Sequence, residues 1–335
     1  MKPSARICVT GGAGFIGSHV VRRLLGLGHE VLLYDSFLHY VHPLDRRHFA
    51  NVESRLEGIA ARTEVVRGST RDLDLLTRTF QRFRPTHIVH LAAMPLAKLA
   101  QEHPEEALEA IVHGTMNTLR ALRDIEGFTR LVYVSSSMIY GDFKQVPAPE
   151  DHPADPKDVY GALKLSGEIT TRAFARRYGI EHAVVRPSAV YGPTDNNRRV
   201  LAAFLENALA GRTIEVNGAS TALDFTYVSD AADGIVLATL HPAGRNQTFN
   251  ITNGHGRTLK EAAEIIAALV PGCRIRYGEA DATAPVRGTL DIERARRLLG
   301  YEPKVSLEDG LKAYLAFLRT QENPVSAQPN QAKPA

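Results

Sequence analysis

The sequence predicts an α/β fold in which a doubly wound parallel sheet is joined by a smaller α/β unit. Short apolar runs rich in β-branched residues alternate with segments of helical periodicity, and a glycine-rich loop follows the first of these runs directly. Continuous apolar runs are typical of strands that helices cover on both faces. A chain of 335 residues, 44% hydrophobic and 23% charged, is long enough for about two globular domains.

The first predicted strand, residues 6–10, leads into a loop with the sequence GGAGFIG and then into a helical segment. Because Gly11, Gly14 and Gly17 have no side chains, the loop amides and the helix N-terminus can face the negative charge of a pyrophosphate. Glycine-rich turns between a strand and a helix also occur for structural reasons alone. The strand before this loop and the helix after it favour dinucleotide binding over a purely structural role.

The second predicted strand, HEVLLYD, ends at Asp35. A carboxylate at this point accepts hydrogen bonds from the hydroxyls of an adenosine ribose and repels a 2′-phosphate. The next residue is Ser36 and not an arginine, so the sequence favours NAD over NADP.

Four more strands of the sheet are predicted, with helices between them. Parallel sheets bind their ligands beyond the carboxyl ends of the strands. We therefore expect the residues at these ends, Ser69 and Thr70, His90 to Ala93, and Ser135 to Ser137, to surround one crevice. The strands lie near residues 63–69, 86–93, 130–136 and 181–188.

After residue 187 the predicted strands become shorter, and helices carry clear start signals such as the capping box of Thr258 and Glu261. We expect a second domain that is interleaved with the end of the first. The polar, proline-rich segment 322–335 is expected to be a disordered tail. The dinucleotide-binding domain is assigned to residues 1–186 with about 220–250, and the smaller domain to about 187–219 and 251–321.

Tyr160 and Lys164 are four residues apart in a helical segment, so both side chains lie on one face of the helix. An ammonium about 4 Å from the phenol, at an effective dielectric constant near 20, contributes on the order of 4 kcal/mol, roughly three pKa units before desolvation is subtracted. We expect this pair to bring the phenolate into working range. A hydroxyl of the preceding serine cluster can donate to the oxygen that Tyr160 deprotonates, or the serines can simply satisfy backbone groups at the strand end.

Charge and cysteine content point to a small-molecule partner. Forty Lys and Arg against 37 Asp and Glu give a formal net charge of +3, which argues against nucleic acid or an anionic membrane as the partner. Cys8 and Cys273 are too few for a disulfide framework, and no apolar leader or run of about 20 apolar residues is found. The expected location is the cytoplasm, and no pattern of metal ligands is present.

Together, the motifs TGGAGFIG, HLAA, SSSMIYG, YGALK, RPSAVYGP, DFTYVSD and RARRLLGYEP resemble those of the extended short-chain dehydrogenase/reductase superfamily. Within it the chain is similar to the NAD-dependent nucleotide-sugar epimerases and dehydratases. The resemblance implies a Rossmann-type sheet, tightly bound NAD and a nucleotide-diphosphate sugar as substrate. It also implies that Tyr160 is the general base, Lys164 its modulator and ribose anchor, and Ser136 the hydroxyl partner. Relatives pair through helices that here span about 104–125 and 157–178, which implies a homodimer.

The resemblance completes the set of candidate site residues. The cofactor-binding candidates are Gly11, Gly14, Phe15, Ile16, Gly17, Asp35, Ser36, Ser69, Thr70, Leu91, Ala92, Ala93, Tyr160, Lys164 and Pro187. The substrate-binding candidates are Met94, Ser136, Ser137, Met138, Ala189, Arg198, Arg199 and Arg287.

Ser137 and Met138 narrow the choice among the reactions that the resemblance implies. Similar enzymes that eliminate water or remove a carboxyl group carry acidic residues here, and those that invert carbons 3 and 5 carry a cysteine. A thioether cannot transfer a proton at carbon. The chemistry that remains is 4-epimerisation through a transient 4-keto sugar. A dehydrogenase or dehydratase that releases a keto sugar, and a non-enzymatic NAD-binding protein, are the alternatives.

Several positions depart from the family pattern. Leu223 stands where relatives carry an arginine for the substrate diphosphate, and Ala189 stands in place of an asparagine. Arg287 matches a second diphosphate arginine of the family. Arg198 and Arg199 either supply further positive charge or lie solvated at the start of a helix.

Overall fold

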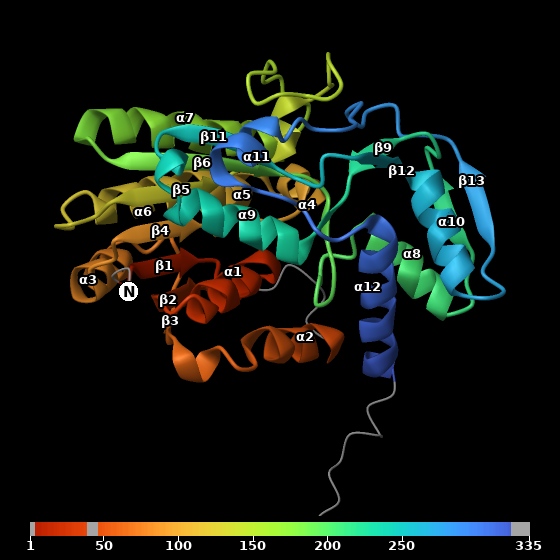
Figure 1. Ribbon diagram of the computed structural model, residues 1–335, viewed down its shortest axis with the longest axis horizontal. Helices are drawn as coiled ribbons and strands as arrows, with labels where there is room; N and C mark the ends of the chain where they lie inside the picture. Colours follow the sequence, from red (N-terminus) through yellow and green to blue (C-terminus); the bar gives the residue numbers. More distant parts are fainter. Residues whose placement is uncertain (1–3, 39–45, 323–335) are drawn as a thin grey trace, which may run out of the picture.

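The computed structural model describes residues 4–38 and 46–322 and is built around a seven-stranded parallel sheet (Figure 1). The strand order is β11-β6-β5-β4-β1-β2-β3, so the order reverses beside β1, and the predicted doubly wound α/β fold is confirmed. All six strands predicted for this sheet are present. The strands are β1 (Arg6–Thr10), β2 (Glu30–Asp35), β3 (Glu64–Arg67), β4 (His87–His90), β5 (Arg130–Val134), β6 (Glu181–Pro187) and β11 (Gln247–Ile251).

Helices cover both faces of the sheet, which explains why its strands are apolar throughout. Ile7 and Val9 of β1 pack toward one face, and Cys8 between them packs toward the other. The first face carries α1 (Phe15–Gly26), α9 (Val228–Leu240) and α11 (Glu293–Leu299), and the second carries α3 (Leu73–Phe83), α6 (Gly114–Leu122) and α7 (Val159–Tyr178).

Shorter helices connect these layers. The region 104–125, expected to be one helix, is interrupted: a π-helical turn at Glu109–His113 separates α5 from α6. The remaining helices near the sheet are α2 (Arg46–Leu56), α4 (Ala97–Glu102) and α5 (Pro104–Leu108).

A second core lies beside the carboxyl end of the sheet. It gathers Leu201, Leu205, Phe225, Ile266 and Leu311. The predicted capping box at the start of α10 is confirmed, because the Thr258 hydroxyl accepts from the Glu261 amide while the Glu261 carboxylate accepts from the Thr258 amide. This unit contains β7 (Val190–Tyr191), β8 (Ile214–Asn217), β9 (Ala222–Asp224), β10 (Thr226–Tyr227), β12 (Gly256–Thr258), β13 (Ile275–Gly278), α8 (Val200–Leu209), α10 (Leu259–Leu269) and α12 (Leu307–Glu322).

The two cores are interleaved along the chain. β11 belongs to the large sheet, and α9 packs on α1. Ala295 and Leu299 of α11 also belong to the first core, although that helix falls in the range 251–321 assigned to the smaller domain. Of the predicted tail, residues 323–335 lie outside the described residues.

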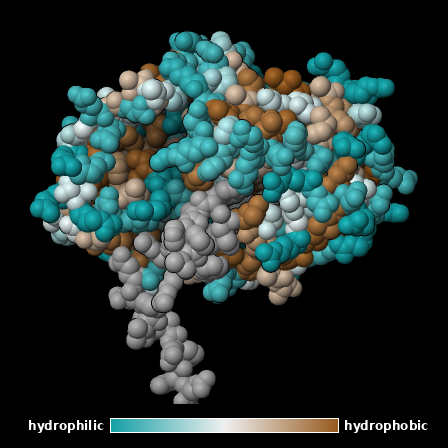
Figure 2. Space-filling view, turned by 180° about the vertical axis from the view of Figure 1, so that it is seen from behind, coloured by the Kyte–Doolittle hydropathy of each residue, from teal (hydrophilic) through white to brown (hydrophobic). Residues whose placement is uncertain are grey.

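On the face of the molecule drawn in Figure 2, hydrophilic residues cover most of the surface and hydrophobic residues form separate patches. In the described part of the chain, every helix is too short or too polar to span a lipid bilayer.

Candidate active site

The glycine loop forms the floor of a groove at the carboxyl end of β1. α1 begins at Phe15 with no side-chain cap, so the amides of its first turn are open to the groove. A Cβ on Gly11, where φ is +73°, would lie 2.8 Å from the Ala92 nitrogen, and one on Gly17 would lie 2.0 Å from the Gly11 oxygen. Only glycine fits at these two positions, because the loop packs closely against the Leu91–Ala92 backbone and against the start of α1.

Asp35 lies at the end of β2, beside the glycine loop. Its Oδ2 accepts from the Ala13 amide at 2.9 Å and its Oδ1 from the Phe37 amide at 2.7 Å. Burial raises the pKa of Asp35, and the two amides oppose this shift. Each carboxylate oxygen keeps a lone pair for a further donor, such as a ribose hydroxyl.

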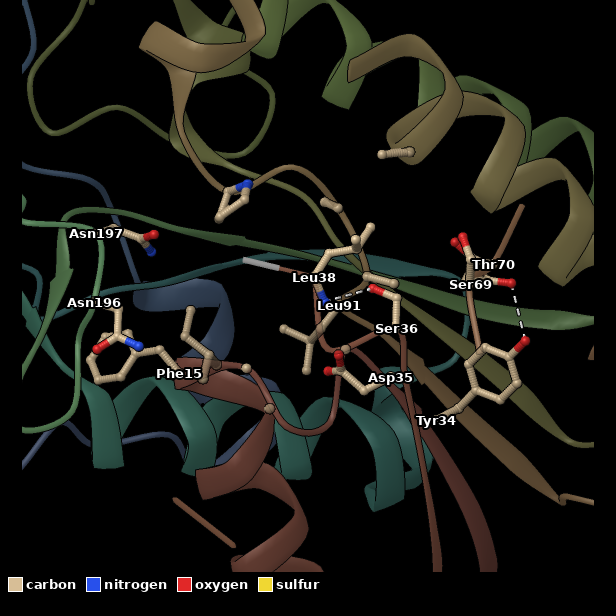
Figure 3. A pocket seen from close by; sticks show the side chains of 18 of the residues that line it. Phe15, Tyr34, Asp35, Ser36, Leu38, Ser69, Thr70, Leu91, Asn196 and Asn197 are labelled. Atoms are coloured by element: carbon tan, nitrogen blue, oxygen red, sulfur yellow. Dashed lines mark hydrogen bonds between the residues drawn. The ribbon is translucent and has the colours of Figure 1, made fainter. Parts of the chain in front are cut away.

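Twelve of the cofactor-binding candidates line this groove. Figure 3 shows Ser69 and Thr70 on the opposite side of Asp35 from Asn196 and Asn197. The geometry fits a dinucleotide, because a backbone cradle, an open helix N-terminus and a carboxylate follow one another along the groove. The twelve are Gly11, Gly14, Phe15, Ile16, Gly17, Asp35, Ser36, Ser69, Thr70, Leu91, Ala92 and Ala93.

Sequence reasoning missed several groove residues. Arg55 of α2 and the loop residues Asn196 and Asn197 line the groove, yet none belongs to a recognised motif. Their positions depend on how α2 and the segment 192–199 fold back on the sheet, and no local pattern indicates that.

Ser136, Tyr160 and Lys164 line a second pocket of about 460 Å³, which shares several lining residues with the groove. Ser136 caps a 3₁₀ turn and accepts from the Met138 amide at 3.1 Å. Tyr160 lies in the first turn of α7, whose N-cap Asp158 accepts from the Gly161 amide at 2.7 Å. Lys164, one turn further along, donates from Nζ to the Val134 carbonyl at 2.9 Å.

The electrostatics of this trio differ from the sequence-based expectation. Burial raises the pKa of Tyr160, and the Arg199 guanidinium and the Ser136 hydroxyl oppose the shift. Burial lowers the pKa of Lys164 to about 8, opposed by Glu168. Burial thus outweighs the groups that oppose it in the protein alone, and the lowering of the Tyr160 pKa by Lys164 stays a prediction.

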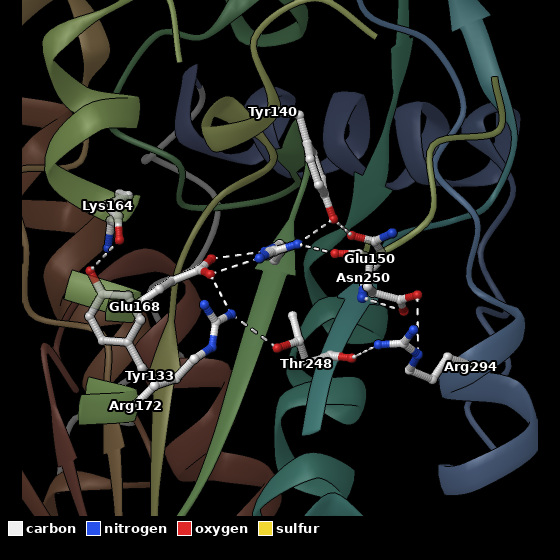
Figure 4. Close-up of polar contacts among 10 residues, drawn as sticks. Tyr133, Tyr140, Glu150, Lys164, Glu168, Arg172, Thr248, Asn250 and Arg294 are labelled. Carbon is white, nitrogen blue, oxygen red and sulfur yellow. Dashed lines mark hydrogen bonds and ion pairs between the residues drawn. The ribbon is translucent and has the colours of Figure 1, made fainter. Parts of the chain in front are cut away.

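A buried network of hydrogen bonds and ion pairs holds α7 in place (Figure 4). Glu168, fully buried one turn after Lys164, accepts from Arg186 Nε at 2.8 Å and from Arg186 Nη2 and Arg172 Nη2, each at 2.7 Å. Arg186 Nη1 donates to the Tyr140 hydroxyl at 2.8 Å. The network joins α7, β6 and the serine turn, so it fixes Tyr160 and Lys164 relative to Ser136.

The second pocket is lined by both cores. Arg287 reaches it from the segment before α11, and its Nε is buried without a hydrogen-bond partner within the described residues. Leu223 lines the same pocket, so the position of the missing family arginine is apolar. Eight predicted site residues line this pocket and not the groove: Ser136, Ser137, Met138, Tyr160, Lys164, Pro187, Ala189 and Arg287. Four more, Ile16, Leu91, Ala93 and Arg199, line both cavities.

Two substrate-binding candidates lie outside both cavities. Met94 is buried in a small cluster with Ala100 and Ala107. Arg198 points to solvent and pairs with Glu206 at 3.0 Å, which matches the alternative of a solvated residue at a helix start. Aromatic residues that reasoning from the sequence missed line the pocket instead: Tyr191, Phe225 and Tyr314.

Comparisons with known proteins agree with this geometry. The model of the NAD dependent epimerase/dehydratase family matches residues 7–252. The chain is 33% identical to UDP-glucose 4-epimerase of Mycolicibacterium smegmatis over 94% of this chain and 99% of that protein. It is 31% identical to UDP-glucuronate 4-epimerase 1 of Arabidopsis thaliana over 93% of this chain and 76% of that protein.

Solved structures show the same relationship. The crystal structure of UDP-glucose 4-epimerase from Thermotoga maritima with UDP-glucose superposes with a TM-score of 0.85 at 29% identity. The match covers 95% of this chain and 100% of that one.

Proposed function

Because the chain belongs to the NAD-dependent epimerase/dehydratase family, we propose that it is a nucleotide-sugar 4-epimerase that works through a transient 4-keto sugar. One observation supports this above the others. Ser136 and Tyr160 line a second pocket that adjoins the groove suited to NAD, since the two cavities share Ile16, Leu91 and Ala93 as lining residues. A sugar in the second pocket would therefore lie against both the cofactor and the tyrosine.

Bound NAD would supply the redox chemistry, the reversible removal of a hydride from carbon 4 of the sugar. Tyr160 removes the proton of the carbon-4 hydroxyl as general base, and Ser136 donates a hydrogen bond to the same oxygen. Lys164 provides positive charge behind the phenol and anchors the nicotinamide ribose. Once the keto sugar has turned over in the pocket, Tyr160 returns the proton and the configuration at carbon 4 is inverted.

The residues beside Ser136 favour this outcome over dehydration or decarboxylation. Ser137 and Met138 line the pocket and carry no group that would exchange a proton at carbon. Hydride transfer out and back needs no such group.

The nucleotide diphosphate is proposed to lie near Arg287. Burial lowers the pKa of this guanidinium, and the described residues provide no hydrogen bond for its Nε. A buried cation without such a partner favours an anionic ligand. Leu223 and Phe225 would offer the substrate an apolar wall, and the smaller domain, residues 187–219 and 251–321, would hold the nucleotide.

The test uses purified protein and a panel of UDP-, GDP-, CDP- and dTDP-sugars. Denaturation is expected to release NAD, and NMR is expected to show each accepted sugar converting to a mixture of carbon-4 epimers without net NADH. Accumulation of NADH with a keto sugar would instead identify a dehydrogenase, and loss of water a dehydratase. If no sugar is converted and the Tyr160→Phe variant keeps its biological activity, the chain is a non-enzymatic NAD-binding protein.

We also propose a homodimer formed through α5, α6 and α7. Large apolar side chains are exposed on these helices: Leu108 at 39%, Met116 at 39% and Ile169 at 58%. Sedimentation at micromolar concentration is expected to show a dimer, and Ile169→Glu to produce monomers. The cysteines Cys8 and Cys273 are free, which fits the proposed cytoplasmic location.

A further inference from the structure

We propose that Arg55 is a cofactor-binding residue whose guanidinium takes the diphosphate of the dinucleotide, and that α2 and the segment 194–199 together form a wall that retains the cofactor. This inference rests on NAD as the cofactor and needs no assumption about the sugar.

Arg55 is a buried cation at the edge of the groove. It reaches the groove from α2 and is 7% exposed. Its Nη1 donates to the Ala13 carbonyl at 3.4 Å, and its Nη2 donates to the Thr194 carbonyl. Its Nε is buried without a partner among the described residues. Because the Ala13 amide also binds Asp35, Arg55 lies at the corner where the glycine loop meets the end of β2.

The other arginines of the groove form ion pairs, whereas Arg55 is influenced by the Asp195 and Asp35 carboxylates without pairing with either. Arg71 pairs with Glu109 at 3.3 Å at an exposed position, and Arg199 pairs with Asp195 at 3.0 Å. Within residues 4–38 and 46–322, Arg55 is the groove-lining arginine without an ion pair. Burial lowers its pKa to about 10, so the guanidinium still carries its charge at neutral pH.

A charge in this position complements what the glycine loop provides. The open first turn of α1 offers amide donors and a partial positive charge, whereas a diphosphate carries full negative charges. A planar guanidinium has five N–H donors, and those of Nη1 and Nη2 that are not given to the Ala13 and Thr194 carbonyls can form charge-assisted hydrogen bonds to a phosphate oxygen.

The segment 194–199 completes the wall. The Asn51 side chain of α2 donates from Nδ2 to Asn196 Oδ1 at 2.5 Å, and Arg55 binds Thr194. Thr194 and Arg198 have φ values of 70° and 44°, so contacts rather than backbone preference hold this segment in place. A dinucleotide bound between the glycine loop and this wall can leave readily only when the contacts to α2 break. An epimerase regenerates its cofactor in each turnover, and slow release suits such an enzyme.

The main test follows the release of NAD from the protein as isolated, with an NAD-hydrolysing enzyme as trap. Arg55→Met is expected to speed release by at least about tenfold, since hydrogen bonds to charged groups contribute roughly 1.5–3 kcal/mol. Asn51→Ala, which only loosens the wall, is expected to speed release by a smaller factor. Glu53→Gln, on the exposed face of the same helix, is the matched control and should release NAD as the unmodified protein does.

A second measurement separates phosphate binding from a structural role. After the trap has emptied the site, Arg55→Met is expected to bind ADP more weakly than the unmodified protein and adenosine equally well. Equal weakening of both ligands would mean that Arg55 only supports the fold. A loss confined to 2′-AMP would place the guanidinium at the ribose 2′ position, and release at the unmodified rate would exclude contact with the cofactor. Each of these three outcomes overturns the proposal, whether or not the chain epimerises a sugar.

Discussion

The carboxylate of Asp35 accepts the amide proton of Ala13 at 2.9 Å, so the end of β2 is joined directly to the glycine loop. The same side chain therefore shapes the loop, and we propose that it also binds a ribose.

Asp35→Asn tests the second role. The amide can still accept from the Ala13 amide, but it loses the negative charge and one acceptor site. We expect NAD to bind about 10- to 100-fold more weakly, equal to roughly 1.5–3 kcal/mol, and discrimination against NADP to shrink. Calorimetric titration of both cofactors measures this. Asp74→Asn, an exposed carboxylate of α3 outside the groove, is the control, and an Asp35 variant that binds NAD normally would exclude Asp35 from ribose recognition.

Gly17→Ala tests the close approach between α1 and the glycine loop. Its Cβ would lie 2.0 Å from the Gly11 oxygen, so the helix or the loop must move. We expect loss of bound NAD and a loss of about 2–4 kcal/mol in the free energy of unfolding. Gly26→Ala, in the last turn of the same helix with nothing within 4 Å, should stabilise by up to about 1 kcal/mol. Equal effects of the two variants in urea titrations would contradict this reading.

Local chemistry made the cofactor groove predictable. Gly11, Gly14, Gly17 and Asp35 act within one strand–loop–helix–strand unit, so their spacing in sequence reflects their positions in space. The place of the residues that follow β4 and β5 could be predicted because the carboxyl ends of parallel strands lie at one edge of the sheet.

The features that the sequence did not reveal depend on contacts between segments that are far apart in the chain. Arg55 acquires its position because α2 packs near Thr194, across 139 residues of chain, and no periodicity indicates that contact. The direction of the Tyr160 pKa shift could not be predicted from the sequence for a related reason. The spacing of Tyr160 and Lys164 shows that they share a helix face, but the extent of burial, which dominates the shift, is a property of the assembled fold.

Tyr160→Phe tests the general base. Removing the phenolic oxygen is expected to lower kcat for epimerisation by about 10³-fold, at the middle of the range for general base catalysis, while bound NAD is retained. Tyr178→Phe, on the exposed end of the same helix, is the control. NMR of the epimer ratio over hours, with NAD content by absorbance, provides both readouts. A variant with near-normal kcat would assign the base to another group.

Arg287→Met tests the anionic subsite of the second pocket. The guanidinium contacts only the remote diphosphate in this proposal, so the Kd for UDP should rise about 10- to 100-fold while kcat changes little. Arg276→Met, an exposed arginine paired with Glu215, provides the matched control. A variant with unchanged UDP affinity but reduced kcat would contradict the assignment.

Acid stability depends on histidines that burial holds neutral. Burial lowers the pKa of His19 and His87 to about 4 and that of His90 to about 3. Between pH 6.5 and about 4 the unfolded chain binds protons at these sites and the folded chain does not. The free energy of unfolding therefore falls as the pH falls through this window, by about 1.4 kcal/mol per pH unit for each histidine.

His87→Gln isolates one of these contributions. Urea titrations from pH 7 to pH 4.5 should show a slope about 1.4 kcal/mol per pH unit shallower than in the unmodified protein, because one titrating site has been removed. His103→Gln, on an exposed residue, should leave the slope unchanged. Parallel curves for all three proteins would mean that His87 takes up a proton in the folded state, and the acid sensitivity would then have to come from other groups.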